Sequence, residues 1–134
     1  MKRRQVREIA FQIIYQVDVG KNDFEVALAL CFGELNLDEG DKAFCRRLVT
    51  GTLSNLKDID KTIEKYAVDW KVDRMLSVDR NLLRLAIFEM LYCEDIPNKA
   101  ALNEAIELAK IFGSEESPKF INGILDKIIR IYGE

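Results

Sequence analysis

Apolar residues recur along the chain at intervals of three and four positions, which is the spacing of one face of an α-helix. No stretch shows the alternation of apolar and polar residues that is typical of a half-buried β-strand. The pattern therefore predicts an all-α protein. Short polar stretches divide the pattern into about seven helices. These predicted helices cover about residues 3–19, 23–35, 41–53, 59–70, 78–93, 97–112 and 117–132.

Several of these helices carry recognisable start or stop signals. Asp23, Ser77 and Ser117 are predicted N-caps, because a short side-chain oxygen can accept a hydrogen bond from the open amides of a first turn. Pro118 suits the first helical position after Ser117, and Gly113 is predicted to end the sixth helix. The fifth helix is apolar over most of its circumference, so we expect it at the centre of a compact helical bundle.

The composition fits a globular domain. Apolar residues make up 49% of the 134 positions and charged residues 32%, which is ordinary usage for a folded protein. The three cysteines are scattered through apolar helical patterns, which favours reduced thiols in a cytosolic protein. No apolar run approaches the roughly 20 residues that a membrane-spanning helix needs. We therefore expect a cytoplasmic protein that does not associate with membranes.

The absence of histidine excludes much catalytic chemistry. Without it the chain has no Ser-His or Cys-His nucleophile and lacks the usual zinc ligand. The cysteines do not have metal-ligand spacing, and there is no glycine-rich phosphate loop. Acidic pairs such as Asp58 with Asp60 are interpreted as solvated charges on polar helix faces. We expect no catalytic residue, no metal site and no cofactor.

Charge is distributed unevenly along the chain. Within residues 1–16, the four cations Lys2, Arg3, Arg4 and Arg7 face only one carboxylate, which gives this segment a charge of +3 and leaves −6 on the remainder. Arginine side chains bind phosphate oxygens and can stack on bases, so the cluster is a candidate RNA clamp. The alternative is a solvated basic start of the chain. Cations at a helix N-terminus oppose the helix dipole, so helix stability does not account for them.

Aromatic residues near this cluster and in the last helix are further candidates. Phe11 and Tyr15 share a helical face with Arg4, although core packing is the simpler interpretation. Phe120 lies at the edge of the apolar stripe of the last helix, where it can either stack on an unpaired base or cover the core. Lys119 beside it is a candidate phosphate contact.

Polar residues on the fifth and sixth helices are weaker candidates. Lys99 and Asn103 are four residues apart and could supply phosphate and base contacts, although each could equally be an ordinary surface residue. Arg84 shares a face with Arg80 in an otherwise apolar helix. Arg84 is a candidate RNA contact, and the alternative is an ion pair with a carboxylate from a neighbouring helix.

The second half of the chain closely resembles the NusB family. The resemblance rests on the segments 78–91 (VDRNLLRLAIFEML), 95–97 (DIP), 102–113 (LNEAIELAKIFG) and 117–126 (SPKFINGILD). The spacing of Arg7, Glu8, Ala10, Gln12 and Tyr15 is similar as well. The likeness extends over essentially the full length and is least close between about residues 19 and 48.

The resemblance implies two helical sub-bundles, covering about residues 1–72 and 73–134. It implies a transcription antitermination factor that binds single-stranded boxA RNA together with NusE, a small-subunit ribosomal protein, within the RNA polymerase antitermination complex, notably on rRNA operons. Carried over by position, the arginine-rich start would contact phosphates, and Lys119 with Phe120 would lie near bases. Glu116 falls at an acidic position beside that surface, where loss of charge should strengthen RNA binding.

Two alternatives to this function remain at the sequence level. One is a helical protein–protein adaptor that does not contact RNA. The other is the NusB-like domain of an rRNA methyltransferase, although this chain shows no methyl-donor site.

If the four N-terminal cations neutralise about four phosphates, the log–log salt slope of RNA binding should be near −3, at about −0.7 for each phosphate on a single strand.

Overall fold

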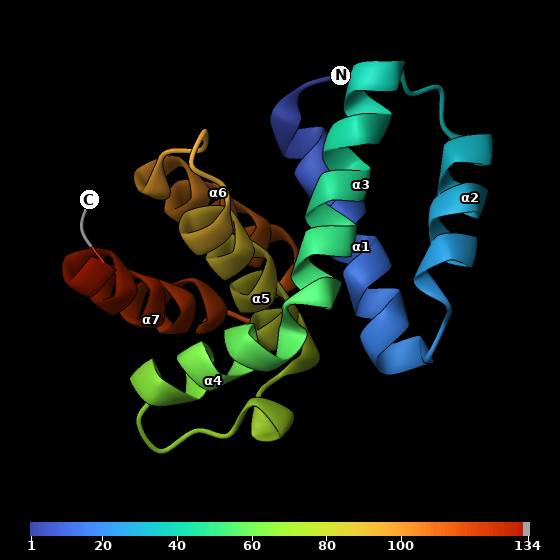
Figure 1. Ribbon diagram of the computed structural model, residues 1–134. Coiled ribbons are helices and arrows are strands. Elements are labelled where there is room, and N and C mark those ends of the chain that lie inside the picture. Colours follow the sequence, from blue (N-terminus) through green and yellow to red (C-terminus); the bar gives the residue numbers. More distant parts are fainter. Residues whose placement is uncertain (133–134) are drawn as a thin grey trace. The chain divides into compact units, whose positions relative to one another are not determined.

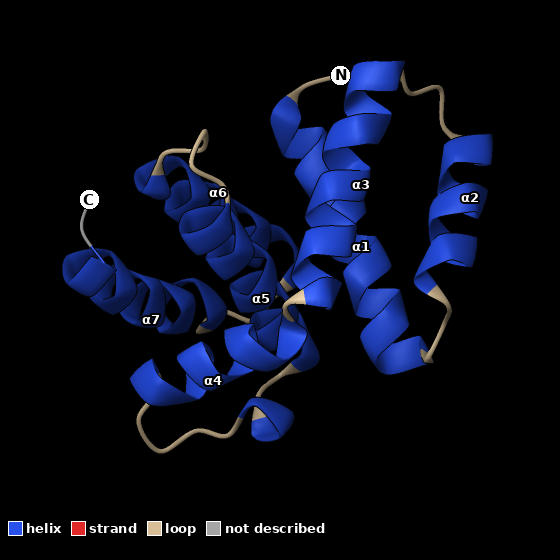
Figure 2. Cartoon of the chain, in the orientation of Figure 1, coloured by secondary structure: helices blue, strands red, loops and turns tan. Residues whose placement is uncertain are grey.

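The computed structural model describes residues 1–132, which form seven α-helices, a single turn of 3₁₀-helix and no strand (Figures 1 and 2). The all-α prediction is therefore confirmed. None of the helices in these residues is long and apolar enough to cross a membrane. The helices are α1 (Arg3–Gly20), α2 (Phe24–Glu34), α3 (Glu39–Ser54), α4 (Leu56–Tyr66), α5 (Ser77–Tyr92), α6 (Asn98–Phe112) and α7 (Ser117–Tyr132), with the 3₁₀ turn η1 (Val72–Arg74) between α4 and α5.

The chain divides into two compact units, an N-terminal unit of Met1–Ser54 and a C-terminal unit of Asn55–Glu134. This boundary lies well before the expected one near residue 72, because α4 packs on α5 and α7 and so belongs to the C-terminal unit. The amphipathic pattern of α4 shows that it buries one face, but it does not identify the helices against which that face packs.

The N-terminal unit is built around the packing of α1 against α3, with α2 alongside. Val6, Ala10 and Ile14 recur at intervals of four on α1 and are fully buried. Leu28 of α2 and Leu48 of α3 are also fully buried. Each large apolar side chain removed from water in this way stabilises the fold by about 1.5–3 kcal/mol.

The start of α2 confirms a predicted cap, whereas α3 begins earlier than predicted. Asp23 accepts a hydrogen bond from the amide of Glu25 at 3.0 Å, as an N-cap should. The third helix begins at Glu39 rather than at Asp41. Asp38 explains the difference, because its side chain accepts a hydrogen bond from the amide of Asp41 at 2.7 Å and so caps the earlier start.

In the C-terminal unit, α5 is the central helix, as predicted. Every residue from 81 to 90 is buried, and α5 packs against α4, α6 and α7. Ser77, however, is the first residue of α5 and not its N-cap, a position that Leu76 holds without a side-chain hydrogen bond. The carbonyl of Ser77 instead accepts a hydrogen bond from the Asn81 side chain at 2.9 Å.

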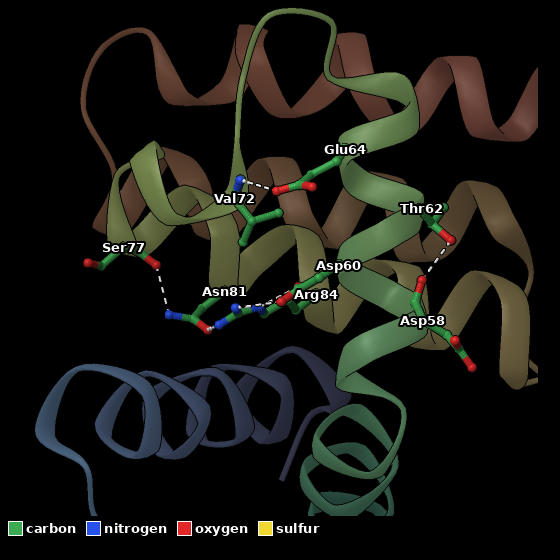
Figure 3. A network of polar contacts seen from close by, with 8 residues as sticks. All are labelled: Asp58, Asp60, Thr62, Glu64, Val72, Ser77, Asn81 and Arg84. Carbon is green, nitrogen blue, oxygen red and sulfur yellow. Dashed lines mark hydrogen bonds and ion pairs between the residues drawn. The ribbon is translucent and has the colours of Figure 1, made fainter.

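The segment after α4 departs most from the predicted pattern. The helix ends at Tyr66, so Trp70 does not continue its apolar stripe and is 50% exposed. Asp69 has a φ of 74°, in the left-handed region that a continuing helix does not allow. The amide of Val72 donates to the Glu64 carboxylate at 2.9 Å, which ties this segment back to α4 (Figure 3).

The turn between α6 and α7 sets the position of the last helix. Gly113 ends α6, as predicted. A Cβ atom at Gly113 would lie 2.5 Å from Oγ of Ser117, so glycine allows the two segments to approach closely. Ser117 is the first residue of α7 rather than its N-cap. Its side chain is fully buried and accepts a hydrogen bond from the amide of Ser114 at 3.0 Å.

Candidate nucleic-acid interface

The basic start of α1 presents three exposed cations, Lys2, Arg3 and Arg4. The guanidinium carbon of Arg3 lies 3.7 Å from the centroid of the Phe44 ring of α3. This cation–π contact orients the side chain without neutralising its charge. Because these cations are at the N-terminus of α1, they lie at the positive end of the helix dipole, where a cation is unfavourable. The first turn contains no acidic residue that would offset their charge.

Arg7 differs from the other three cations because it is only 8% exposed. Its guanidinium carbon lies 5.5 Å from the centroid of the same Phe44 ring. The prediction grouped Arg7 with the exposed phosphate contacts because charge alone does not show which face of a helix is buried. Arg7 instead helps to pack α1 against α3, and three cations remain at the surface.

Lys2 and Gln5 account for how the first turn of α1 is held. The amide of Lys2 donates to Oε1 of Gln5 at 3.0 Å, which satisfies one of the open amides of the helix start. The terminal amine of Met1 lies 3.5 Å from the carboxylate of Asp41 on α3. The interruption of the arginine run at Gln5 therefore has a structural reason.

Phe11 and Tyr15 belong to the packing of α1. Phe11 is 2% exposed, and its ring centroid lies 6.1 Å from that of Tyr15, with the planes tilted by 57°. A buried ring is not available for stacking on a base. The core interpretation of Phe11 is therefore confirmed.

Arg84 lies in an internal network and not at an open surface. Its side chain is 9% exposed, and two of its nitrogens, Nε and Nη2, each donate to an oxygen of Asp60 on α4 at 2.9 Å (Figure 3). The third nitrogen, Nη1, donates to Oδ1 of Asn81 at 3.0 Å. The alternative of a carboxylate partner from a neighbouring helix is confirmed, and Arg84 is not proposed as an RNA contact.

Lys119, Phe120 and Glu116 come together at the start of α7. They line a hollow of about 460 Å³, together with Trp70 and with Lys127, which is about two turns further along α7. Phe120 is half-buried, and its ring lies edge-on to Trp70 with 6.0 Å between centroids and 76° between planes. The other lining residues are Tyr66, Ala67, Val68, Gly123 and Ile124.

A second hollow of about 220 Å³ adjoins the first. The two share Trp70, Phe120 and Glu116, so the aromatic pair stands between them. Asp79 and Arg74 also line this smaller hollow. Sequence reasoning missed Trp70, Lys127 and Arg74, since nothing in the helical pattern shows that the segment after α4 turns back toward α7.

Asp79 of α5 contacts the start of α7 through the Ser117 side chain. It is 5% exposed, and burial raises the pKa of its carboxyl, while a hydrogen bond with the Ser117 side chain lowers it to a smaller extent. Ser117 in turn accepts from the amide of Ser114. Because Ser117 is three residues before Phe120, this chain of contacts fixes the turn that presents Lys119 and Phe120.

Lys99 and Asn103 are both exposed and lie four residues apart on α6. Neither lines either hollow. The structure therefore leaves them as separate surface residues of the C-terminal unit. Within residues 1–132, no three carboxylate or thiol side chains are grouped so that they could hold a metal ion.

Comparisons with known proteins find matches that cover nearly the whole chain. A family model described as the NusB family matches residues 4–130. The transcription antitermination protein NusB of Heliobacterium modesticaldum is 52% identical over 130 residues, which are 97% of this chain. The matched region is 63% of that relative, so the chain spans a little less than two thirds of its length.

Solved structures show the same fold. NusB of T. maritima is 39% identical and superposes with a TM-score of 0.89, covering 97% of this chain and 92% of that one. A crystal structure of the antitermination factors NusB and NusE in complex with dsRNA contains a chain that is 25% identical. Its TM-score is 0.86, with 98% of this chain and 100% of that chain covered. This protein therefore belongs to the NusB family.

Proposed function

We propose that this chain is a transcription antitermination factor that binds boxA RNA together with NusE and acts in the cytoplasm within the RNA polymerase antitermination complex, notably on rRNA operons. The observation that carries the proposal is the exposed cationic start of α1, where Lys2, Arg3 and Arg4 stand at a helix start whose first turn contains no acidic residue. Positive charges at a helix N-terminus lower the stability of the helix, but they favour the binding of a polyanion such as RNA.

The relatives support this function. The H. modesticaldum relative is named as a transcription antitermination protein, and a solved complex contains NusB, NusE and RNA. The agreement of fold with that complex extends over 98% of this chain.

The proposed role of each residue in RNA binding follows from the chemistry of its side chain. Lys2, Arg3 and Arg4 bind phosphate oxygens and supply affinity that is independent of sequence. Phe120 stacks on an unpaired base, and Lys119 beside it contacts a phosphate. The protein makes and breaks no bond in this role, since it works by binding alone. Lys99 and Asn103 stay as candidate contacts of lower priority, because they lie outside both hollows.

NusE is proposed to bind the C-terminal unit, and the two proteins together are proposed to bind RNA more tightly than this chain does alone. With three exposed cations at the start of α1, RNA binding by that cluster should have a log–log salt slope near −2, at about −0.7 for each phosphate. The slope is smaller than the value near −3 expected from four cations, because Arg7 is buried.

A titration of labelled RNA tests the function. Single-stranded boxA RNA, a scrambled strand of the same composition and a boxA-containing duplex are each titrated at several salt concentrations, with and without NusE. We expect tighter binding of the boxA strand than of the scrambled strand when NusE is present. Equal binding of the two strands would refute the proposal, and NusE binding without any RNA binding would instead favour a protein–protein adaptor.

A further inference from the structure

Trp70 is the single tryptophan of the chain, and half of its surface is exposed. This exposure leaves part of a large aromatic ring at the surface, where a ligand can reach it. The ring is not loosely attached, because it lies edge-on to Phe120 with 6.0 Å between the centroids. The two rings together present an aromatic surface to the solvent.

The backbone around Trp70 is held in place from two sides. The amide of Trp70 donates to the carbonyl of Ala67 at 3.0 Å, and the amide of Val72 donates to the Glu64 carboxylate at 2.9 Å. Asp69, inside the turn that the first of these hydrogen bonds closes, has a φ of 74°, which is unfavourable for a residue other than glycine. The segment keeps this conformation because its ends are fixed, and Trp70 is preorganised.

The hollow beside Trp70 has the size and charge for a nucleotide. Its volume of about 460 Å³ is within the range of small-molecule sites, roughly 300–1,000 Å³. Lys119 and Lys127 contribute two positive charges to its lining, against one negative charge from Glu116. Lys127 donates to the carbonyl of Tyr66 at 3.4 Å, and an ammonium group has further protons for a second acceptor.

We propose that Trp70 and Phe120 form an aromatic wall on which an unpaired RNA base stacks, while Lys119 and Lys127 bind the adjoining phosphates. This proposal rests on the proposed RNA-binding function and extends the contact from the start of α7 to the segment after α4. A lysine pair beside two partly exposed aromatic rings matches an RNA strand, whereas an apolar protein segment would offer neither ammonium group an anionic partner. RNA is therefore the occupant that the lining favours.

Fluorescence provides a direct test, because Trp70 is the only tryptophan that could report. The full-length protein is titrated with unlabelled boxA RNA while Trp70 emission is followed, and affinity is measured in parallel by anisotropy of labelled RNA, with NusE present. We expect RNA to quench Trp70. W70A should lose at least about fivefold in affinity, since a stacked base contributes on the order of a fivefold to hundredfold effect. W70F should keep most of the affinity.

Tyr92→Ala is the matched control. Tyr92 is 42% exposed and its ring stacks on a phenylalanine, Phe88, at 5.7 Å, yet it lines neither hollow. We expect Y92A to bind RNA as the parent does. Lys127→Gln should in addition reduce the salt slope by about 0.7, the contribution of one phosphate contact on a single strand.

The outcomes separate this proposal from the function on which it rests. If labelled RNA binds but Trp70 is not quenched, and W70A binds as tightly as Y92A, the aromatic wall is refuted while RNA binding stands. If NusE alone quenches Trp70 and RNA adds no change, the hollow is a protein-docking surface and the proposal fails. If no RNA preference is found by anisotropy, both the function and the aromatic wall are refuted.

Discussion

Arg84 binds Asp60 through two parallel hydrogen bonds, Nε to Oδ1 and Nη2 to Oδ2, each 2.9 Å long. The pair joins α5 to α4 inside the C-terminal unit. Asn81 extends the network, because its Oδ1 accepts from Arg84 at 3.0 Å and its Nδ2 donates to the carbonyl of Ser77 at 2.9 Å (Figure 3). An arginine that could be taken for an RNA ligand is thus a structural residue.

Replacing Arg84 with methionine should destabilise the protein by up to about 3 kcal/mol, because the carboxylate of Asp60, whose side chain is 27% exposed, would lose its partner. Chemical denaturation followed by circular dichroism measures the loss. A double variant, Asp60→Leu with Arg84→Met, should recover much of the stability, since no unpaired charge is then left. Unchanged RNA affinity in the folded single variant would support the structural role, whereas a loss of affinity with full stability would restore Arg84 to the RNA site.

The helical architecture was predictable from the spacing of apolar residues, and the exceptions have local causes. The boundaries of α1 and α6 and the central place of α5 followed from periodicity and from Gly113. The end of α4 did not, because the left-handed conformation of Asp69 leaves no strong mark on residue type. The predicted fourth helix therefore includes Trp70, whereas Trp70 lies beyond the end of α4 and is half exposed.

The candidate site was predictable only where residue type and exposure go together. Lys2, Arg3 and Arg4 are at the surface, as a basic start suggests. Arg7 and Arg84 are buried, because arginine can place its guanidinium against an aromatic ring or a carboxylate of another helix. Which partner is nearby depends on tertiary packing, and spacing along one helix does not contain that information.

Arg3→Ala combined with Arg4→Ala should weaken boxA binding and reduce the magnitude of the salt slope by about 1.4, the contribution of two phosphate contacts. The cost in stability should be small, about 0.5–1 kcal/mol, from loss of the contact between Arg3 and Phe44. RNA titrations at several salt concentrations measure the first effect, and thermal melting measures the second. Lys61→Ala, which removes an exposed cation outside the cluster, is the control and should leave the slope unchanged. An unaltered slope in the double variant would remove the start of α1 from the interface.

Phe120→Ala should reduce RNA affinity by roughly fivefold to a hundredfold, since one stacked base contributes about 1–3 kcal/mol. The ring is half-buried against Trp70, so a smaller loss of stability should accompany the change. RNA anisotropy and denaturation of the same preparation separate the two effects. Phe120→Leu keeps apolar bulk but lacks a stacking face, and it should retain stability better than affinity. A loss of stability with unchanged affinity would identify Phe120 as a core residue.

Cys45 should make stability depend on alkaline pH. The thiol is fully buried, and burial, with the nearby Cys31 as a smaller cause, raises its pKa from 9.0 to about 12. The unfolded chain releases this proton above about pH 9, while the folded protein keeps it, so the unfolding free energy should fall between about pH 9 and pH 12 and be unaffected by this group at lower pH. Denaturation at pH 8, 9 and 10 measures the fall, and Cys45→Ala should show a shallower one. An identical pH dependence in the variant would contradict the buried-thiol interpretation.

Glu116→Gln should strengthen RNA binding, and the gain should be larger at low salt. Glu116 is exposed, and its position in the lining of both hollows, beside Trp70 and Phe120, places a negative charge where a phosphate would approach. Removing that charge weakens repulsion of the strand, and dissolved ions screen the same repulsion, so the difference between variant and parent should shrink as salt rises. Glu94→Gln is the matched control, because Glu94 is exposed but lies outside both hollows. Equal gains from the two substitutions would mean that only the net charge of the protein matters, whereas a gain confined to Glu116→Gln places the RNA strand at the start of α7.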